Sequence, residues 1–139
     1  MDIVVDTNIL FSFFRENPVR YIIINAKSLG LKLFAPEYAI QELKNKINDL
    51  IKYTKVNSIK ELEIIFENLE QNIETKPIDF FKEYKPEALK ITPDEKDAPF
   101  FALALKLKCS IWSNEPRLKN QSIIKIYSTP DMKKLLNYT

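Results

Sequence analysis

Apolar and polar residues follow two patterns along this chain. Short, uninterrupted apolar runs are typical of strands that are buried on both faces, as in the centre of a parallel sheet. Between them lie longer stretches in which apolar residues recur every three or four positions, as they do along one face of a helix. The runs predict strands at residues 3–5, 31–35, 72–76, 110–112 and 123–127. The periodic stretches predict helices at residues 7–14, 18–29, 36–51, 58–69, 80–89, 98–108 and 130–137.

The predicted strands and helices alternate along the chain. Such alternation is typical of a parallel sheet that is covered by helices on both faces. We therefore expect an α/β fold, a three-layer α/β/α sandwich whose central, mostly parallel sheet has four to five strands. The 139 residues suffice for one hydrophobic core and are too few for two ordinary domains, so residues 1–139 should form one domain.

Three residue types are scarce enough to exclude whole classes of chemistry. The chain has no histidine, which excludes Ser-His-Asp and Cys-His catalysis and any His-ligated zinc or iron. Its one cysteine, Cys109, excludes an internal disulfide and multi-cysteine zinc sites. Its one glycine, Gly30, excludes a glycine-rich nucleotide-binding loop. A metal site must therefore be built from oxygen ligands, which favours Mg²⁺ or Mn²⁺.

The charge balance and the longest apolar runs limit the expected partners. The formal net charge is only +2, from 21 basic and 19 acidic residues, so a nucleic acid would have to be bound by a local cluster of basic side chains. No apolar run approaches the ~20 residues that cross a bilayer. The N-terminal residues do not look like a secretory signal. We expect a cytoplasmic protein without a membrane partner.

Asp6 is the first candidate for chemistry, because it directly follows the apolar run 3–5. Open α/β sheets bind their ligands at the carboxyl ends of the strands. A carboxylate placed there costs free energy unless it is paired or holds a metal. The alternative is that Asp6 caps the next helix. Both interpretations can hold if Thr7 or Asn8 caps that helix.

Asp97 is the second candidate. Pro99 cannot lie deep in a helix, so Asp97 is restricted to the first turn or to the cap of the apolar helix 98–108. The helix dipole favours an anion at that end. A plain N-cap is the alternative, and Asp94 and Glu95 are neighbouring acids of the same turn.

Two glutamates complete the set of candidates. Glu42 lies in the second turn of the helix 36–51, off its apolar stripe, and the alternative there is a solvated helix face. Glu115 leaves the strand 110–112 much as Asp6 leaves the first strand, although polar residues before a proline also form simple turns.

Together these residues resemble the PIN-domain family, the nuclease fold of the VapC-type toxins. Residues 4–10 (VVDTNIL) are close to the opening motif of the family, and residues 97–105 (DAPFFALAL) are similar to its third motif. Glu42 matches a glutamate in the helix after the second strand. Residues 112–115 (WSNE) resemble the fourth motif, with Glu115 where relatives usually have aspartate.

The resemblance implies a metal-dependent endoribonuclease that hydrolyses phosphodiester bonds of single-stranded RNA. It implies Mg²⁺ or Mn²⁺ as the cofactor, and Asp6, Glu42, Asp97 and Glu115 as the metal ligands and catalytic residues. Asn8 and Ser113 would support these acids or their waters. Basic side chains near the motifs would contact RNA phosphates. They are Arg15, Lys96, Arg117 and Lys119.

Three alternatives stay open. The resemblance fits a toxin with an antitoxin protein as partner and a homodimeric state, and it equally fits a stand-alone nuclease. Glu115 and the modest basicity favour a non-catalytic PIN-like module that binds RNA or a protein partner. A phosphatase of the haloacid-dehalogenase type is less favoured, because Asn8 stands where that type has its second aspartate.

Overall fold

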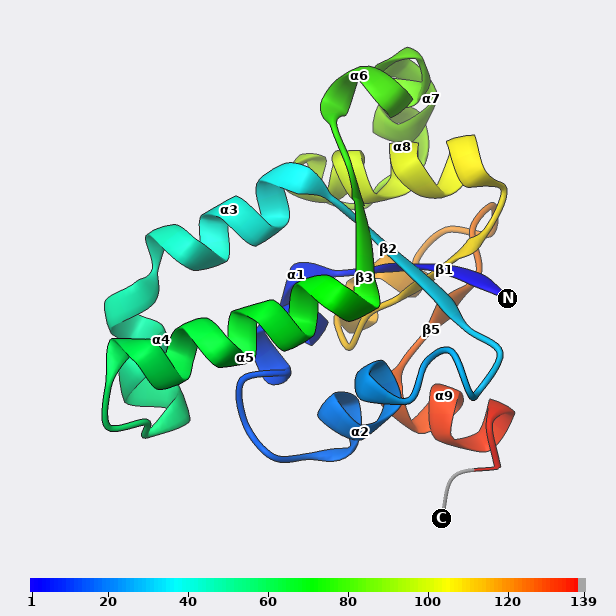
Figure 1. The fold of residues 1–139 in the computed structure, drawn as a ribbon. Coiled ribbons are helices and arrows are strands. Elements are labelled where there is room, and N and C mark those ends of the chain that lie inside the picture. Colours follow the sequence, from blue (N-terminus) through cyan, green and yellow to red (C-terminus); the bar gives the residue numbers. More distant parts are fainter. Residues whose placement is uncertain (138–139) are drawn as a thin grey trace.

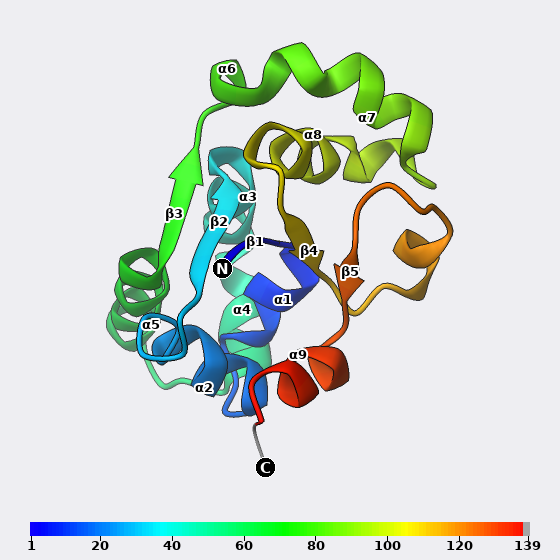
Figure 2. The same cartoon turned by 90° about the vertical axis from the view of Figure 1, so that its right-hand side faces the viewer.

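The computed structural model describes residues 1–137 of the chain, and its centre is a five-stranded, all-parallel sheet. The strand order is β3-β2-β1-β4-β5, so β1 lies in the middle. The strands are β1 (Asp2–Val5), β2 (Lys32–Pro36), β3 (Ile73–Lys76), β4 (Ser110–Trp112) and β5 (Ile126–Tyr127). Figures 1 and 2 show the strands running side by side, with β3 and β5 at the two edges of the sheet.

Helices cover both faces of this sheet. Figures 1 and 2 show α8 on one face, with α6 and α7 stacked outside it, and α2, α5 and α9 on the other. The α-helices are α1 (Thr7–Ser12), α2 (Pro18–Ile24), α3 (Glu37–Asn45), α4 (Ile47–Thr54), α5 (Ile59–Asn72), α6 (Ile78–Phe81), α7 (Lys85–Ile91), α8 (Ala98–Leu107) and α9 (Thr129–Leu135). Three short 3₁₀ turns are η1 (Lys82–Tyr84), η2 (Glu95–Asp97) and η3 (Pro116–Lys119). The predicted three-layer α/β/α sandwich is confirmed. No helix within residues 1–137 has the length and apolarity to span a membrane.

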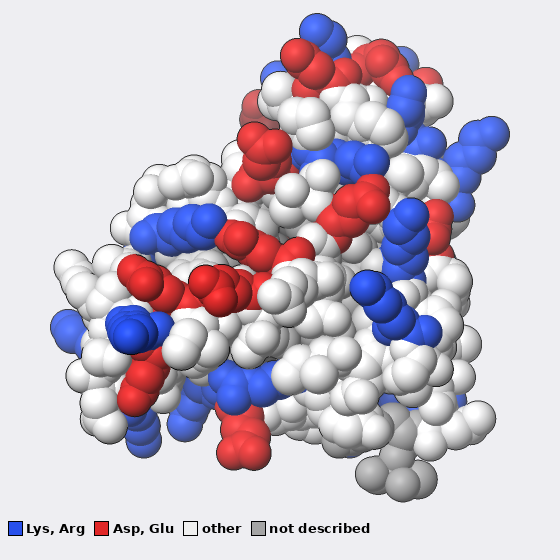
Figure 3. All heavy atoms as spheres, in the orientation of Figure 1, with Lys and Arg blue, Asp and Glu red and all other residues white. Residues whose placement is uncertain are grey.

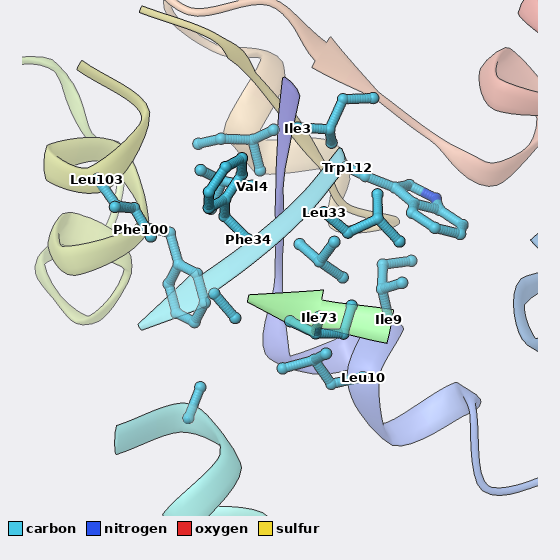
Figure 4. Packing of buried hydrophobic residues seen from close by; sticks show 14 of the residues in the cluster. Ile3, Val4, Ile9, Leu10, Leu33, Phe34, Ile73, Phe100, Leu103 and Trp112 are labelled. Carbon is cyan, nitrogen blue, oxygen red and sulfur yellow. The ribbon is translucent and has the colours of Figure 1, made fainter. Parts of the chain in front are cut away.

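The central strand is buried on both faces, as its apolar run predicts. Ile3, Val4 and Val5 are all completely buried. Figure 4 shows Val4 on the side of Phe100 of α8, whereas Ile3 lies on the opposite side of β1. Since successive side chains of a strand point to opposite faces, a strand with helices on both sides needs apolar residues at every position. Asp6 is the first polar residue after this run.

One predicted helix is divided in two, and another ends earlier than its apolar stripe indicates. The expected helix 36–51 is divided at Lys46, which joins α3 to α4 with a non-helical backbone (φ −103°, ψ 33°). The expected helix 18–29 ends at Ile24, and turns continue to Gly30, which has a positive φ of 78°. Both predictions were wrong in extent, because a turn can continue an apolar stripe that periodicity alone cannot distinguish from a helix.

Two other predicted segments are also reorganised. The expected strand 123–127 pairs only at Ile126 and Tyr127. Before it, the Gln121 side-chain amide accepts hydrogen bonds from the backbone N–H groups of Ile123 and Ile124 and donates one to the Ile124 carbonyl, so this backbone is not free to pair as a strand. The expected helix 80–89 is replaced by the succession α6, η1 and α7.

Candidate active site

Asp6 lies at the carboxyl end of β1 and is 5% exposed. Its Oδ1 accepts a 2.7 Å hydrogen bond from the Thr7 backbone N–H, and its Oδ2 accepts a 2.6 Å bond from Ser113 Oγ. Asp6 itself is therefore the N-cap of α1, and the expectation that Thr7 or Asn8 would cap this helix was wrong. The carboxylate of Asp6 caps α1 and also lines an open pocket at this edge of the sheet.

The parallel pairing of β1 with β4 brings Ser113 to Asp6. Val5 is in register with Trp112, and the Asp6 backbone N–H donates to the Trp112 carbonyl over 3.0 Å. Both strands end at this level, so the next residues, Asp6 and Ser113, leave the sheet side by side. The buried Ser113 Oγ also accepts a 3.1 Å bond from the Glu115 backbone N–H. One hydroxyl thus joins the turns after both strands.

Asp97 ends η2 and directly precedes α8. It occupies the N-cap position of α8, but its side chain makes no capping hydrogen bond. The interpretation of Asp97 as a plain N-cap therefore does not hold. Its carboxylate is half-buried, and burial together with the charges of Asp6 and Asp94 raises its pKa to about 6. The Asp97 carboxylate thus makes no capping hydrogen bond, and its surroundings disfavour its ionised form.

The pKa of Asp6 is also raised, mainly because the carboxyl is buried. The hydrogen bonds from Ser113 and Thr7 oppose this shift because they stabilise the ionised form, whereas the charge of Glu115 adds to it. Asp6 and Asp97 thus both carry charge that the protein environment disfavours. A cation placed between such carboxylates would relieve this cost.

Glu115 is held by Arg117. Glu115 Oε1 accepts hydrogen bonds from the Arg117 backbone N–H (3.2 Å) and from Arg117 Nε (3.0 Å), which lowers the pKa of Glu115. A second guanidinium nitrogen of Arg117 lies 3.7 Å from Asp94 Oδ2. This arginine therefore lies between two acids and partly neutralises the charge of the site.

The four predicted acids line one open pocket of ≈ 500 Å³. Asn8 lines it as well. Ser113 does not line the pocket but is hydrogen-bonded to Asp6, which does. Glu42 enters from α3 as an exposed side chain. The lining consists of Asp6, Thr7, Asn8, Tyr38, Glu42, Asp94, Lys96, Asp97, Phe100, Glu115 and Arg117.

Tyr38 is a residue of this pocket that the sequence patterns did not single out. Burial, and then the charges of Glu42, Asp6 and Asp97, raise the pKa of its phenol, so the hydroxyl stays protonated at neutral pH. A signal was present in the sequence, because Tyr38 precedes Glu42 by four positions in one helix. Residues at that spacing share a helix face, so a functional Glu42 would have implicated Tyr38.

Two of the four basic residues expected at the rim lie elsewhere. Lys96 and Arg117 line the pocket. Arg15 instead stacks on the Tyr53 ring, 5.2 Å from its centroid, and Lys119 pairs with Asp131 at 2.8 Å. On the face shown in Figure 3, basic and acidic side chains are intermixed, so this face offers no uniformly basic surface to a nucleic acid.

The donor chemistry of the pocket fits a hard divalent cation that keeps much of its water. Within residues 1–137, no three Asp, Glu or Cys side chains already form a group that could hold an ion. Mg²⁺ does not need such a cage, because it is usually bound by one or two carboxylates together with waters and substrate phosphates. Asp6 and Asp97 supply two anionic oxygen donors whose mutual repulsion the ion would reduce.

A model of a known protein family covers most of this chain: the family described as PIN domain matches residues 4–128. The chain belongs to the PIN domain family. PIN domains are generally nucleases and generally use divalent metal ions, so a nuclease-type function is supported for this chain as well. The matched region contains every residue of the pocket lining. None of the curated proteins matches the chain.

Proposed function

We propose that this PIN domain is a metal-dependent endoribonuclease that hydrolyses phosphodiester bonds of single-stranded RNA with Mg²⁺ or Mn²⁺. The observation that carries the proposal is that Asp6 and Asp97, two carboxyls with raised pKa values, line the same open pocket. Structural acids are usually given partners that lower their pKa, whereas acids at functional sites often have raised values.

Asp6 and Asp97 would hold the ion, directly or through water, and Glu42 and Glu115 would bind its outer waters. When bound, the ion supplies Lewis-acid polarisation of the scissile phosphate and a water of lowered pKa. Ser113 orients Asp6 through its hydrogen bond, which also favours the ionised form of the carboxyl. Asn8, at the start of α1, offers an amide to the same waters.

A single strand suits the pocket better than a duplex, because a flexible strand can bend its phosphate into an acid-lined hollow. Lys96 and Arg117 lie at this pocket and provide the positive charge that phosphates require. The same activity would serve a toxin that is paired with an antitoxin protein or a stand-alone nuclease. Co-purification with the product of a neighbouring small gene would identify the toxin.

The test replaces Asp6 by asparagine. Purified Asp6→Asn should lose Mn²⁺-dependent cleavage of single-stranded RNA, while the wild-type protein should cleave it and stop when EDTA is added. The variant should remain folded, because Ser113 Oγ can accept from the new amide and one buried charge is removed. Asp49→Asn, on an exposed position of α4, is the matched control and should cleave like wild type. Full cleavage by Asp6→Asn would overturn the proposal.

A non-catalytic PIN-like module is the second candidate. It is favoured by one observation, the arginine that already neutralises Glu115 and Asp94. Calorimetric titration with Mn²⁺ separates the two candidates. Saturable binding that Asp97→Asn removes supports the nuclease, and RNA binding without any heat of Mn²⁺ binding supports the module.

A further inference from the structure

A second pocket, of ≈ 310 Å³, lies next to the acid-lined one and shares Tyr38 and Lys96 with it. It is formed between the start of α3, the α6–α7 segment and the N-terminal half of α8. Figures 1 and 2 show α6 and α7 stacked on α8, the helix that follows Asp97. We call it the α6–α7 pocket. Its lining consists of Tyr38, Ile78, Phe81, Lys82, Lys85, Leu89, Glu95, Lys96, Ala98, Pro99 and Ala102.

The inner part of the α6–α7 pocket is apolar, and large apolar side chains stay exposed at its rim. Phe81 and Ala98 are buried, whereas Ile78 is 60% exposed and Leu89 is 41% exposed. Exposed apolar side chains that gather around a hollow often mark a binding site. The protein thus keeps an apolar surface beside its most polar pocket.

Basic side chains surround this apolar surface. Lys82, Lys85 and Lys96 line the pocket, against one acid, Glu95. Lys82 is paired with Asp79 at 3.2 Å, but Lys85 and Lys96 form no ion pair within residues 1–137. Both are exposed. Their charge is available to an anionic ligand that would also bring an apolar or aromatic group.

A nucleotide of a single strand has this combination of groups. Proteins bind single strands by placing bases against aromatic and apolar side chains while cations follow the backbone. The volume is at the lower end of the range that small ligands occupy, which suits one base and is small for the face of a partner helix. Lys96 lines both pockets, so a phosphate bound by it would lie between a base in one pocket and a phosphodiester in the other.

We infer that the α6–α7 pocket binds the base of a nucleotide next to the cleaved phosphodiester of single-stranded RNA. Tyr38 and the apolar rim contact the base, and Lys85 and Lys96 contact the backbone. The Tyr38 ring lies against Phe100 of α8, with 6.2 Å between ring centroids, which fixes it at the boundary of the two pockets. This inference rests on the proposed function, because it assigns a subsite to the same substrate.

The first experiment measures binding of a fluorescent single-stranded oligoribonucleotide to the full chain in EDTA, where metal-dependent cleavage cannot occur. Two variants change the pocket: the double variant Ile78→Ser/Leu89→Ser removes apolar surface from exposed positions, and Lys85→Glu reverses a charge. Each should weaken binding about tenfold, since stacking of one base and one phosphate contact have effects of this order. The matched controls Ile64→Ser and Lys60→Glu, on exposed positions of α5 outside both pockets, should bind like wild type.

The second experiment shows whether a base occupies the pocket. A series of oligonucleotides, each lacking one base, is titrated against wild type and against Ile78→Ser/Leu89→Ser. Wild type should lose affinity at one position of the series, and the double variant should not distinguish that oligonucleotide from the intact one. Circular dichroism and thermal unfolding of each variant confirm that it is folded.

Three results would overturn the inference. They are wild-type affinity in both pocket variants, equal loss in pocket and control variants, and no affinity of wild type for any single strand. The first two leave the proposed nuclease untouched, because cleavage is measured separately with Mn²⁺. Conversely, binding that follows the expected pattern in a protein that never cleaves RNA would reject the nuclease and keep the subsite.

Discussion

Ser113 Oγ donates a 2.6 Å hydrogen bond to Asp6 Oδ2, although 107 positions separate the two residues in the chain. The same hydroxyl accepts from the Glu115 backbone N–H, so one small side chain holds the turns at the ends of β1 and β4. The bond favours the ionised form of a carboxyl whose burial favours the neutral form. Ser113 therefore helps to fix the position of Asp6 and favours its ionised form.

Replacing this serine should lower the stability of the fold. Ser113→Ala leaves a buried carboxylate oxygen and the Glu115 N–H without their partner, which should cost about 1–3 kcal/mol of the free energy of unfolding at pH 7. Urea unfolding of wild type and variant measures this loss. Ser12→Ala removes an exposed serine hydrogen bond in α1 and should cost less. Equal stability of Ser113→Ala and wild type at pH 7 would contradict the role assigned to Ser113.

The raised pKa of Asp97 predicts a particular dependence of stability on pH. With a pKa of about 6 in the folded protein and the ordinary value of 3.8 when unfolded, Asp97 binds more protons in the folded state between these values. The contribution of Asp97 to stability should therefore fall as the pH rises from about 4 to about 6, because the folded state must give up a proton it holds more tightly.

Asp97→Asn isolates this contribution from the other carboxyls. Asp131, whose pKa is lowered by Lys119 and Ser128, acts in the opposite direction, since its contribution is lost as the pH falls. The difference between Asp97→Asn and wild type should grow in favour of the variant from pH 4 to pH 7. Thermal unfolding at several pH values without metal measures it. A constant difference would show that Asp97 titrates normally.

Arg117 should limit the affinity of the pocket for cations. Arg117→Gln removes the charge that pairs with Glu115 and Asp94 and that lowers the pKa of Asp97. Repulsion between the Arg117 charge and a bound Mn²⁺ should cost roughly 1 kcal/mol near the protein surface. Without this repulsion, Mn²⁺ should bind about fivefold more tightly to the variant, as measured by calorimetry. RNA binding in EDTA should weaken instead. Lys119→Gln, on the same 3₁₀ turn but outside the pocket, should change neither the affinity for Mn²⁺ nor the affinity for RNA.

Two lysines away from the site should reduce the stability of the fold. Lys55 and Lys108 follow α4 and α8 with positive φ angles of 58° and 55°, a conformation that favours glycine. Lys108→Gly and Lys55→Gly should each raise the free energy of unfolding by about 0.5–1 kcal/mol. Lys46→Gly is the control. Lys46 has a negative φ, so glycine relieves no strain there and this variant should be less stable than wild type. Chemical denaturation distinguishes these directions.

Local patterns predicted the elements whose apolar residues follow a single clear pattern. The run Ile3-Val4-Val5 favours a strand buried on both faces, and the long apolar segment of α8 favours a buried helix; the structure shows both. The division at Lys46 escaped prediction because Ile40, Leu43, Ile47 and Leu50 continue one stripe across it. The reduction of β5 depends on side-chain bonds of Gln121, which no periodicity records.

Which residues would line the acidic pocket was predictable to a similar degree, whereas their roles stay a prediction. Asp6 followed from its position after a buried strand, and Asp97 from the restriction that Pro99 imposes. Glu42 required the family resemblance, since its helix face looks like any solvated face. The ion pairs of Arg117 and the place of Tyr38 depend on how separate segments pack, and this information is not present in either segment alone.

The position of β1 at the centre of the sheet has a consequence for biosynthesis. β1 is made before β2 and β4 but lies between them in the sheet, so one of its two neighbours is absent until residue 112 has been added. Asp6 receives its hydrogen bond only when Ser113 follows. A growing chain therefore carries no assembled site until β4 and Ser113 have been added, and an activity that needs this arrangement would arise only after that point.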